Sequence, residues 1–134
     1  MASIIRVTTT PTGQQVPVDS FDVAWSPDST KVVFTSFANA FVPNDTNQAP
    51  DVFVKDLTTG ATMRASETVT GGDGFYGASY GIFRTNTLVT FETGDNLTSN
   101  PVFNGHPGIN QKDLVTGVDT IISTTTENAV LDNS

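Results

Sequence analysis

The sequence has no cysteine and a single histidine, His106. The absence of cysteine excludes disulfides, thiolate zinc sites and a cysteine nucleophile, and one histidine excludes the common two-histidine metal sites within one chain. Basic residues are also few, since 6 Lys and Arg stand against 14 Asp and Glu, for a formal net charge of −8. Such an acidic surface repels phosphate backbones, so we expect no binding to nucleic acid. No apolar run approaches the ~18 residues that a membrane helix needs, so we expect no membrane insertion.

Helix formers are scarce as well, and no stretch keeps a helical apolar period over about 11 residues. Threonine, valine and phenylalanine are frequent instead, in short segments bounded by Gly, Pro, Asn and Asp, which predicts an all-β chain. Turn signals separate these segments. The expected strands are 4–9, 21–25, 31–36, 51–57, 61–66, 78–83, 88–93, 109–114 and 119–124.

The two halves of the chain match when the sequence is shifted by 57 residues. No gap is needed between residues 31 and 66, and 11 positions there are identical, among them Val32 with Val89 and Phe34 with Phe91. Both copies contain Lys-Asp-Leu followed by a Thr-Gly turn. A period of roughly 40–50 residues with four short strands is typical of a propeller blade. The period is longer here because the loop between the second and third strands is expanded.

Each repeat is therefore expected to form a four-stranded antiparallel sheet that resembles a propeller blade. We place the outer strand and lead-in of a preceding blade at 1–20, a first blade-like repeat at 21–77 and a second at 78–134. The strand at 4–9 is assigned to the preceding blade because Ile-Arg-Val-Thr at 5–8 echoes Met-Arg-Ala-Ser at 63–66.

Residues 21–36 carry a more specific pattern. Phe-Asp-Val-Ala-Trp-Ser-Pro-Asp at 21–28 precedes Lys-Val-Val-Phe-Thr-Ser at 31–36, and Asp-Val-Phe-Val-Lys-Asp-Leu follows at 51–57. This pattern resembles the repeat of the TolB-like (PD40, or WD40-like) β-propellers, in which a Trp-Ser-Pro-Asp-Gly turn joins the first two strands. Ser29 departs from the usual glycine, and Ile-Phe-Arg replaces Trp-Ser-Pro in the second copy. The resemblance implies a blade fold of a bacterial type, and family members bind proteins, sugars or nothing known.

The location of the protein is less constrained. Met1, Ala2 and Ser3 lack the basic and apolar regions of a secretory signal, so either the protein stays inside the cell or the chain is an excised or processed piece. Similar long-loop members of the resembling family occur in secreted and surface proteins. The resemblance therefore favours an extracellular or periplasmic location, with which the absence of cysteine is compatible.

Two blades are too few to close a propeller ring, which typically has 4–8 blades. Their open faces must be covered, because soluble monomers rarely expose large apolar patches. Three solutions remain open: copies of this chain assemble into a ring, the chain is a fragment of a longer propeller, or the two sheets form a compact sandwich. We expect a homo-oligomer, and exchange of the extra N-terminal strand is one way to close it.

Aromatic residues divide into two groups. Those at strand positions are expected in the core: Trp25, Phe34, Phe53 and Phe91. Those in loops could stack on sugars or anchor a partner, and together with the loop histidine they are the candidate ligand-binding residues: Phe41, Phe75, Tyr76, Phe103 and His106. The same loop aromatics could instead cap the edges of the long loops.

Two further motifs have a functional and a structural interpretation. Asp45, Asn47 and Asp51 offer oxygen atoms at alternating positions, as calcium requires, but such side chains also bind their own backbone in Asx-turns. Gly-Ala-Ser-Tyr-Gly around Ser79 fits the Gly-x-Ser-x-Gly nucleophile pattern literally. That chemistry needs a strand-to-helix turn, and no helix is expected after residue 81, so we interpret the match as coincidence.

These observations favour a non-enzymatic binding or scaffold module of β-propeller type, whose long loops meet a protein or a carbohydrate. We expect no catalytic residues and no cofactor, with calcium as the one possible ion. Two alternatives remain: a propeller-type hydrolase or lyase with a site completed between chains, and a blade fragment whose main property is self-assembly.

Overall fold

The structure, a computed structural model, describes residues 3–68, 71–72, 74–95, 97–98 and 108–123. Eight strands form two antiparallel sheets of four, in the orders β1-β2-β3-β4 and β5-β6-β7-β8. The described residues contain no helix, so none of them forms a helical membrane span. The predicted all-β fold with two four-stranded blade-like repeats is confirmed. The strands are β1 (Ser20–Trp25), β2 (Lys31–Ser36), β3 (Asp51–Asp56), β4 (Thr62–Arg64), β5 (Ala78–Phe83), β6 (Leu88–Thr93), β7 (Gly108–Asp113) and β8 (Asp119–Ile121).

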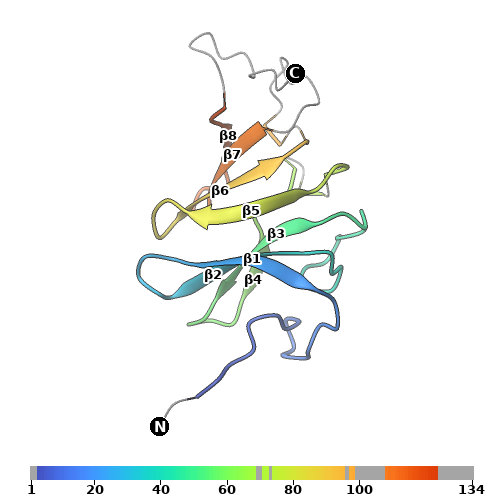
Figure 1. Cartoon of the computed structure of the whole chain (residues 1–134), viewed down its shortest axis with the longest axis vertical. Helices are drawn as coiled ribbons and strands as arrows, with labels where there is room; N and C mark the ends of the chain where they lie inside the picture. Colours follow the sequence, from blue (N-terminus) through green and yellow to red (C-terminus); the bar gives the residue numbers. More distant parts are fainter. Residues whose placement is uncertain (1–2, 69–70, 73, 96, 99–107, 124–134) are drawn as a thin grey trace.

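The two sheets are stacked face to face, with β5 lying across the first sheet against β1, β2 and β3 (Figure 1). Gly81 of β5 permits this close approach, because a Cβ atom there would lie 2.7 Å from Val33 and 2.8 Å from Val52. Apolar side chains from both sheets form the core between them. Its buried members are Val33, Val52, Val54, Ala65, Ala78, Val89, Phe91 and Leu97.

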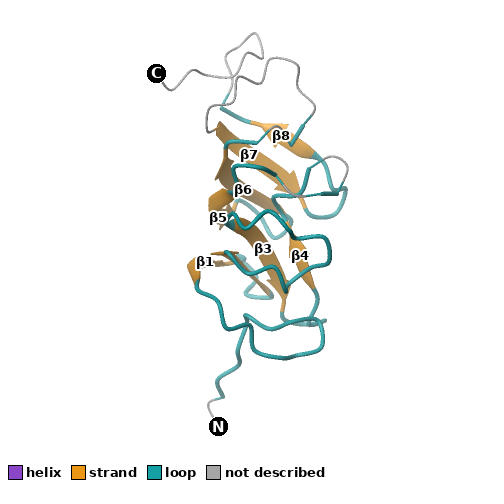
Figure 2. Cartoon of the chain, turned by 90° about the vertical axis from the view of Figure 1, so that its right-hand side faces the viewer, coloured by secondary structure: helices purple, strands orange, loops and turns teal. Residues whose placement is uncertain are grey.

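The other face of the first sheet packs against the N-terminal segment and the loop after β2 (Figure 2). Its buried residues are Val16, Val32, Phe34, Ala38, Phe41 and Phe53. The expected strand at 4–9 is not formed, since this segment makes only one isolated bridge, between Thr9 and Gln15. A strand needs a neighbouring strand to pair with, and this segment has none beside it.

The connections divide between two edges of the molecule (Figure 1). Short turns link β1 to β2, β3 to β4, β5 to β6 and β7 to β8 at one edge, which we call the short-turn edge. The long connections leave from the opposite edge, which we call the long-loop edge. The expected ligand-binding residues that the structure describes, Phe41, Phe75 and Tyr76, lie on these long connections.

The internal repeat is visible in the turn chemistry. The Asp56 carboxylate accepts hydrogen bonds from the N–H groups of Thr58 and Thr59, at 2.8 and 3.2 Å. Asp113 holds Val115 and Thr116 in the same way, again at 2.8 and 3.2 Å. The Thr58 hydroxyl donates to Asp56 at 2.6 Å and, with the backbone bonds, lowers the pKa of that carboxyl group, and the backbone bonds lower the pKa of Asp113. The Lys-Asp-Leu repeat thus builds the same turn twice.

The first hairpin has a backbone conformation after Asp28 that favours glycine. Ser29 adopts a φ of 61°, a left-handed conformation that glycine takes without strain. The Asp28 carboxylate accepts hydrogen bonds from the hydroxyls of Ser26 and Thr30, both at 2.7 Å. These bonds hold the pKa of Asp28 at about 2, so the turn is built around an ionised carboxylate.

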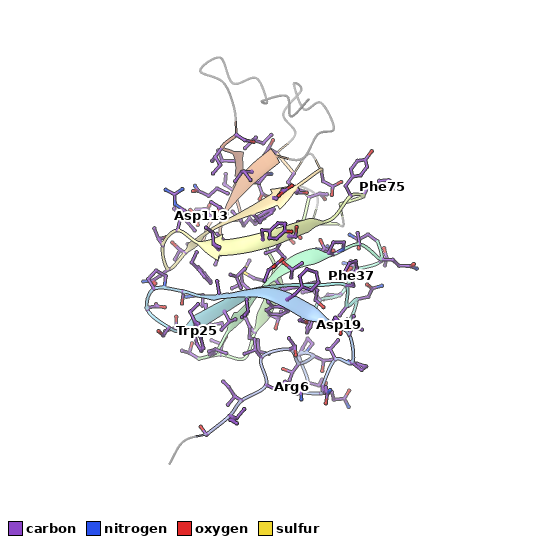
Figure 3. All side chains as sticks on the ribbon, in the orientation of Figure 1. Arg6, Asp19, Trp25, Phe37, Phe75 and Asp113 are labelled. Atoms are coloured by element: carbon purple, nitrogen blue, oxygen red, sulfur yellow. The ribbon has the colours of Figure 1, made fainter. Side chains whose placement is uncertain are left out.

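Trp25 is not a core residue in this chain, contrary to expectation. Its exposed fraction is 58%, and Figure 3 places it on the side of β1 turned away from β5. Phe34, Phe53 and Phe91 are buried as predicted. The difference arises because Trp25 lies on a sheet face that the N-terminal segment covers only in part.

Candidate functional site

Two adjacent aromatic side chains stand in solvent at the long-loop edge. Phe75 is 81% exposed and Tyr76 is 63% exposed. Their rings form an edge-to-face pair, with centroids 5.1 Å apart and an interplanar angle of 85°. Figure 3 shows Phe75 projecting outward from the connection that leads into β5. Large exposed aromatic surfaces of this kind are typical of ligand or partner contacts.

The backbone beneath this pair is fixed by one carboxylate. Asp95, two residues after the end of β6, accepts hydrogen bonds from the N–H groups of Phe75 at 2.6 Å, Tyr76 at 3.1 Å and Gly77 at 3.0 Å. Gly74 has no room for a side chain, because a Cβ atom there would overlap the Asp95 carboxylate. Hydrogen bonds to an ionised acceptor are stronger than neutral ones, so the aromatic side chains project from a rigid base.

A surface cavity of about 330 Å³ lies next to this base. Tyr76 forms one wall, Pro50 another, and Glu92 supplies a half-buried carboxylate. The Pro50 carbonyl accepts a hydrogen bond from the N–H of Ala78 at 2.7 Å, which ties the start of β5 to the start of β3. An aromatic ring beside a carboxylate offers both stacking and hydrogen bonding to a polar ligand.

Phe41 does not belong to this site. Its exposed fraction is 0%, and its ring centroid lies 5.2 Å from that of Phe34 and 5.0 Å from that of Phe53. The loop after β2 folds back over the first sheet and buries this side chain. The expectation that Phe41 is a ligand-binding loop aromatic is therefore wrong, and Phe41 is a core residue.

The proposed calcium ligands are engaged with protein groups. Asn47 accepts a hydrogen bond from the N–H of Ala49 at 2.9 Å, which is the Asx-turn alternative. Its side-chain amide donates to Asp51 at 3.0 Å, and Ser66 donates to the other Asp51 oxygen at 2.6 Å. Asp45 lies 3.9 Å from the Arg64 guanidinium. A cation at this loop would have to displace these donors.

The remaining candidates can be placed only in part. Phe103 and His106 lie outside the described residues. Ser79 lies within β5, where it pairs with Glu92 of β6, and the described residues after it contain no helix. The strand-to-helix turn of the nucleophile pattern is therefore not formed. Among the described residues, no group of three or more His, Asp or Glu side chains could hold a metal ion.

A buried cation lies between the two sheets, away from the aromatic pair. The Lys112 ammonium contacts the carboxylates of Asp119 at 3.0 Å and Glu67 at 3.5 Å. Burial raises the pKa of Asp119 to about 6, although its bond to Lys112 acts in the opposite direction. The contact with Glu67 joins the two repeats, so this cluster has a structural role.

Sequence reasoning missed the roles of Asp95 and Glu92. Asp95 anchors a backbone segment that precedes it by 18–20 residues, and Glu92 lines the cavity beside that segment. The Gly-Asp pair at 94–95 signals a turn but carries no information about that distant segment.

Comparison with known proteins adds no family assignment. No protein-family model matches the chain, and no curated protein matches its sequence.

Proposed function

We propose that the protein is a non-enzymatic binding module built from two blades of the TolB-like propeller type, and that its long-loop edge meets a protein or a glycan. The observation that carries the proposal is the exposed pair Phe75 and Tyr76 on a base fixed by Asp95. Because hydrogen bonds already fix the backbone beneath the pair, binding need not order this segment, which keeps the entropy cost low. The left-handed Ser29 in the first turn supports the relation to the propeller repeat.

The expected homo-oligomer belongs to this proposal, because one chain leaves sheet faces open that a further sheet would cover. No observation on the described residues favours the enzymatic alternative. Calcium binding is not part of the proposal either, because the Asn47 side-chain amide already donates a hydrogen bond to the Asp51 carboxylate.

The test is retention of the full chain on an array of neutral and acidic glycans. We expect retention by the unmodified protein and loss in the Phe75→Ala/Tyr76→Ala double variant. Val115→Ala is the matched control, because Val115 is equally exposed but lies at the short-turn edge. Retention of the double variant at the level of the unmodified protein would show that the aromatic pair is not the contact surface.

If no glycan is retained, the protein alternative is tested at the same residues. A photoreactive amino acid at position 75 should then cross-link a partner from an extract, and the same group at position 115 should not. Equal labelling from both positions would contradict a binding site at the long-loop edge.

A further inference from the structure

The two sheets have corresponding residues in different surroundings. Strand register aligns Ala24 with Ile82. Ala24 pairs with Val33 and Ile82 pairs with Thr90, and these two partners are equivalent under the 57-residue shift. The 57-residue shift likewise aligns Val52 with Ile109 and Ala65 with Ile122. On the first sheet these three positions contribute to the core between the sheets.

On the second sheet the same positions carry three exposed isoleucines, Ile82, Ile109 and Ile122. Each is at least as large as its counterpart, although it is exposed to solvent. We call these three residues the open face of the second sheet. An open face that keeps apolar side chains at contact positions is typical of an interaction surface.

The opposite face of the first sheet shows the complementary relation. Trp25 pairs with Val32, and Phe83 pairs with the corresponding Val89. Phe83 packs against the core between the sheets, whereas Trp25 is exposed. The position of Trp25 is thus exposed in the first repeat, whereas the equivalent position in the second repeat, Phe83, is covered by the first sheet.

The N-terminal segment contacts this face of the first sheet in the way that residues 63–67 contact the second sheet. The Lys55 ammonium contacts the Thr9 hydroxyl at 3.1 Å, just as Lys112, its repeat equivalent, contacts Glu67 at 3.5 Å. Val7 packs on the outer core of the first sheet. Residues 5–9 therefore lie on the first sheet as residues 63–67 lie on the second.

This segment fills the place of an outer strand without forming one. It has no ladder partner beyond the single bridge at Thr9, and Ile4 and Ile5 remain exposed. β8, by contrast, has three register pairs with β7 and the buried Asp119–Lys112 contact. If the second sheet of another copy docked on this face, its β8 would be held there by more interactions than residues 5–9 are.

We infer that a second copy of this chain docks its open face, Ile82, Ile109 and Ile122, on the Trp25 side of the first sheet, and that its β8 takes the place of residues 5–9. The contact is head to tail, because different faces of the two copies meet. Repetition of such a contact closes a ring or extends a filament. The inference rests on the self-association in the proposed function and is independent of the aromatic pair.

Val23 shows that the new interface is not an exact copy of the internal one. It corresponds to Gly81, the residue that allows β5 to approach the first sheet closely. A side chain at this position holds the incoming sheet further away, so the docked copy is separated more widely at β1. Like charges also oppose docking, since each copy carries −8. Added salt should therefore strengthen association.

The experiment measures absolute mass by light scattering and the fluorescence of Trp25, the only tryptophan. We expect the mass to exceed 14.2 kDa and to rise with concentration, with a blue shift of the emission as Trp25 becomes buried. A mass of 14.2 kDa at every concentration and salt level would overturn the inference.

Two variants test the head-to-tail geometry. Ile109→Glu damages the open face and Trp25→Glu damages the receiving face, so each alone should stay at 14.2 kDa. An equimolar mixture retains one intact pair of faces, and should form a dimer of twice that mass and nothing larger. Circular dichroism verifies that both variants are folded. If the folded variants still assemble alone, or if they fail to form a dimer when mixed, the inferred contact is wrong.

Control variants separate this inference from ligand binding. Val115→Glu adds the same charge at the short-turn edge and should leave the mass of the unmodified protein unchanged. Phe75→Ala should also keep that mass while it weakens ligand retention. Loss of assembly in the Val115 variant to the same extent as in the Ile109 variant would show a general charge effect and overturn the assigned face.

Discussion

Replacement of Phe41 by alanine should destabilise the protein strongly, although Phe41 lies in a loop. The side chain is fully buried and contacts two other rings, Phe34 and Phe53. Burial of a phenylalanine contributes about 1.5–3 kcal/mol, and each ring pair adds about 0.5–1.5 kcal/mol. With the cavity left behind, the expected loss is about 3–5 kcal/mol. This is a large part of the ~5–15 kcal/mol that stabilises a typical domain.

The assay is urea unfolding followed by circular dichroism. A loss of this size should move the unfolding midpoint by about 1 M or more, because small proteins lose about 1–3 kcal/mol per molar urea. Phe41→Leu should cost roughly 1–3 kcal/mol and gives a measurable value even if the alanine variant does not fold. Phe75→Ala is the control, since an exposed side chain should change stability by about 0.5 kcal/mol or less. A Phe41→Ala midpoint as close to the unmodified protein as that of Phe75→Ala would refute the packing of this loop.

Three further changes test other parts of the structure. Gly81→Ala places a Cβ atom 2.7 Å from Val33, and this overpacking should cost about 1–3 kcal/mol in the same urea assay; an unchanged midpoint would mean that β5 does not lie so close. Asp95→Asn removes one of the two oxygens that accept hydrogen bonds from three N–H groups. This should lower the free energy of unfolding by about 1–3 kcal/mol and speed hydrogen exchange at residues 75–77. Exchange in the variant as slow as in the unmodified protein would contradict the role of Asp95 as an anchor. Because burial raises the folded pKa of Asp119 from 3.8 to about 6, the folded state binds this proton more tightly, so this group adds stability as the pH falls from about 6 to 4. An NMR titration of the carboxyl carbon with a midpoint below 4 would contradict this direction.

The strands and turns could be predicted because the interactions that define them are local. Asp56 binds N–H groups two and three residues ahead, so the turn is encoded within a few positions. The 57-residue repeat extended this prediction to both sheets, since Asp113 builds the same turn. The eight strands differ from their expected ranges only at the ends, but the expected strand at 4–9 is not formed, because its only pairing is the isolated bridge at Thr9.

The candidate site was harder to predict because its interactions connect distant segments. Asp95 holds a backbone segment that lies 18–20 residues earlier, and no spacing rule links the two. The position of Phe41 outside the strands predicts a surface residue, yet the loop folds back so that its ring contacts Phe34 and Phe53. Whether a residue lies in a strand or a loop can be predicted locally, but its burial depends on the distant segments that pack against it.

Trp25 is the opposite case, and it connects the repeat to the inferred assembly. The sequence pattern predicts a core position for Trp25, which is exposed in this chain, whereas its counterpart Phe83 packs against the core between the two sheets. Trp25 is exposed because, among the described residues, the first sheet has a neighbouring sheet on only one side. A residue of this type is costly to leave in water, since burial of a large aromatic side chain is strongly favourable. Trp25 can therefore stabilise the protein by burial only if another sheet covers it. Its exposure is a reason to expect a second copy, and its fluorescence reports whether that copy binds.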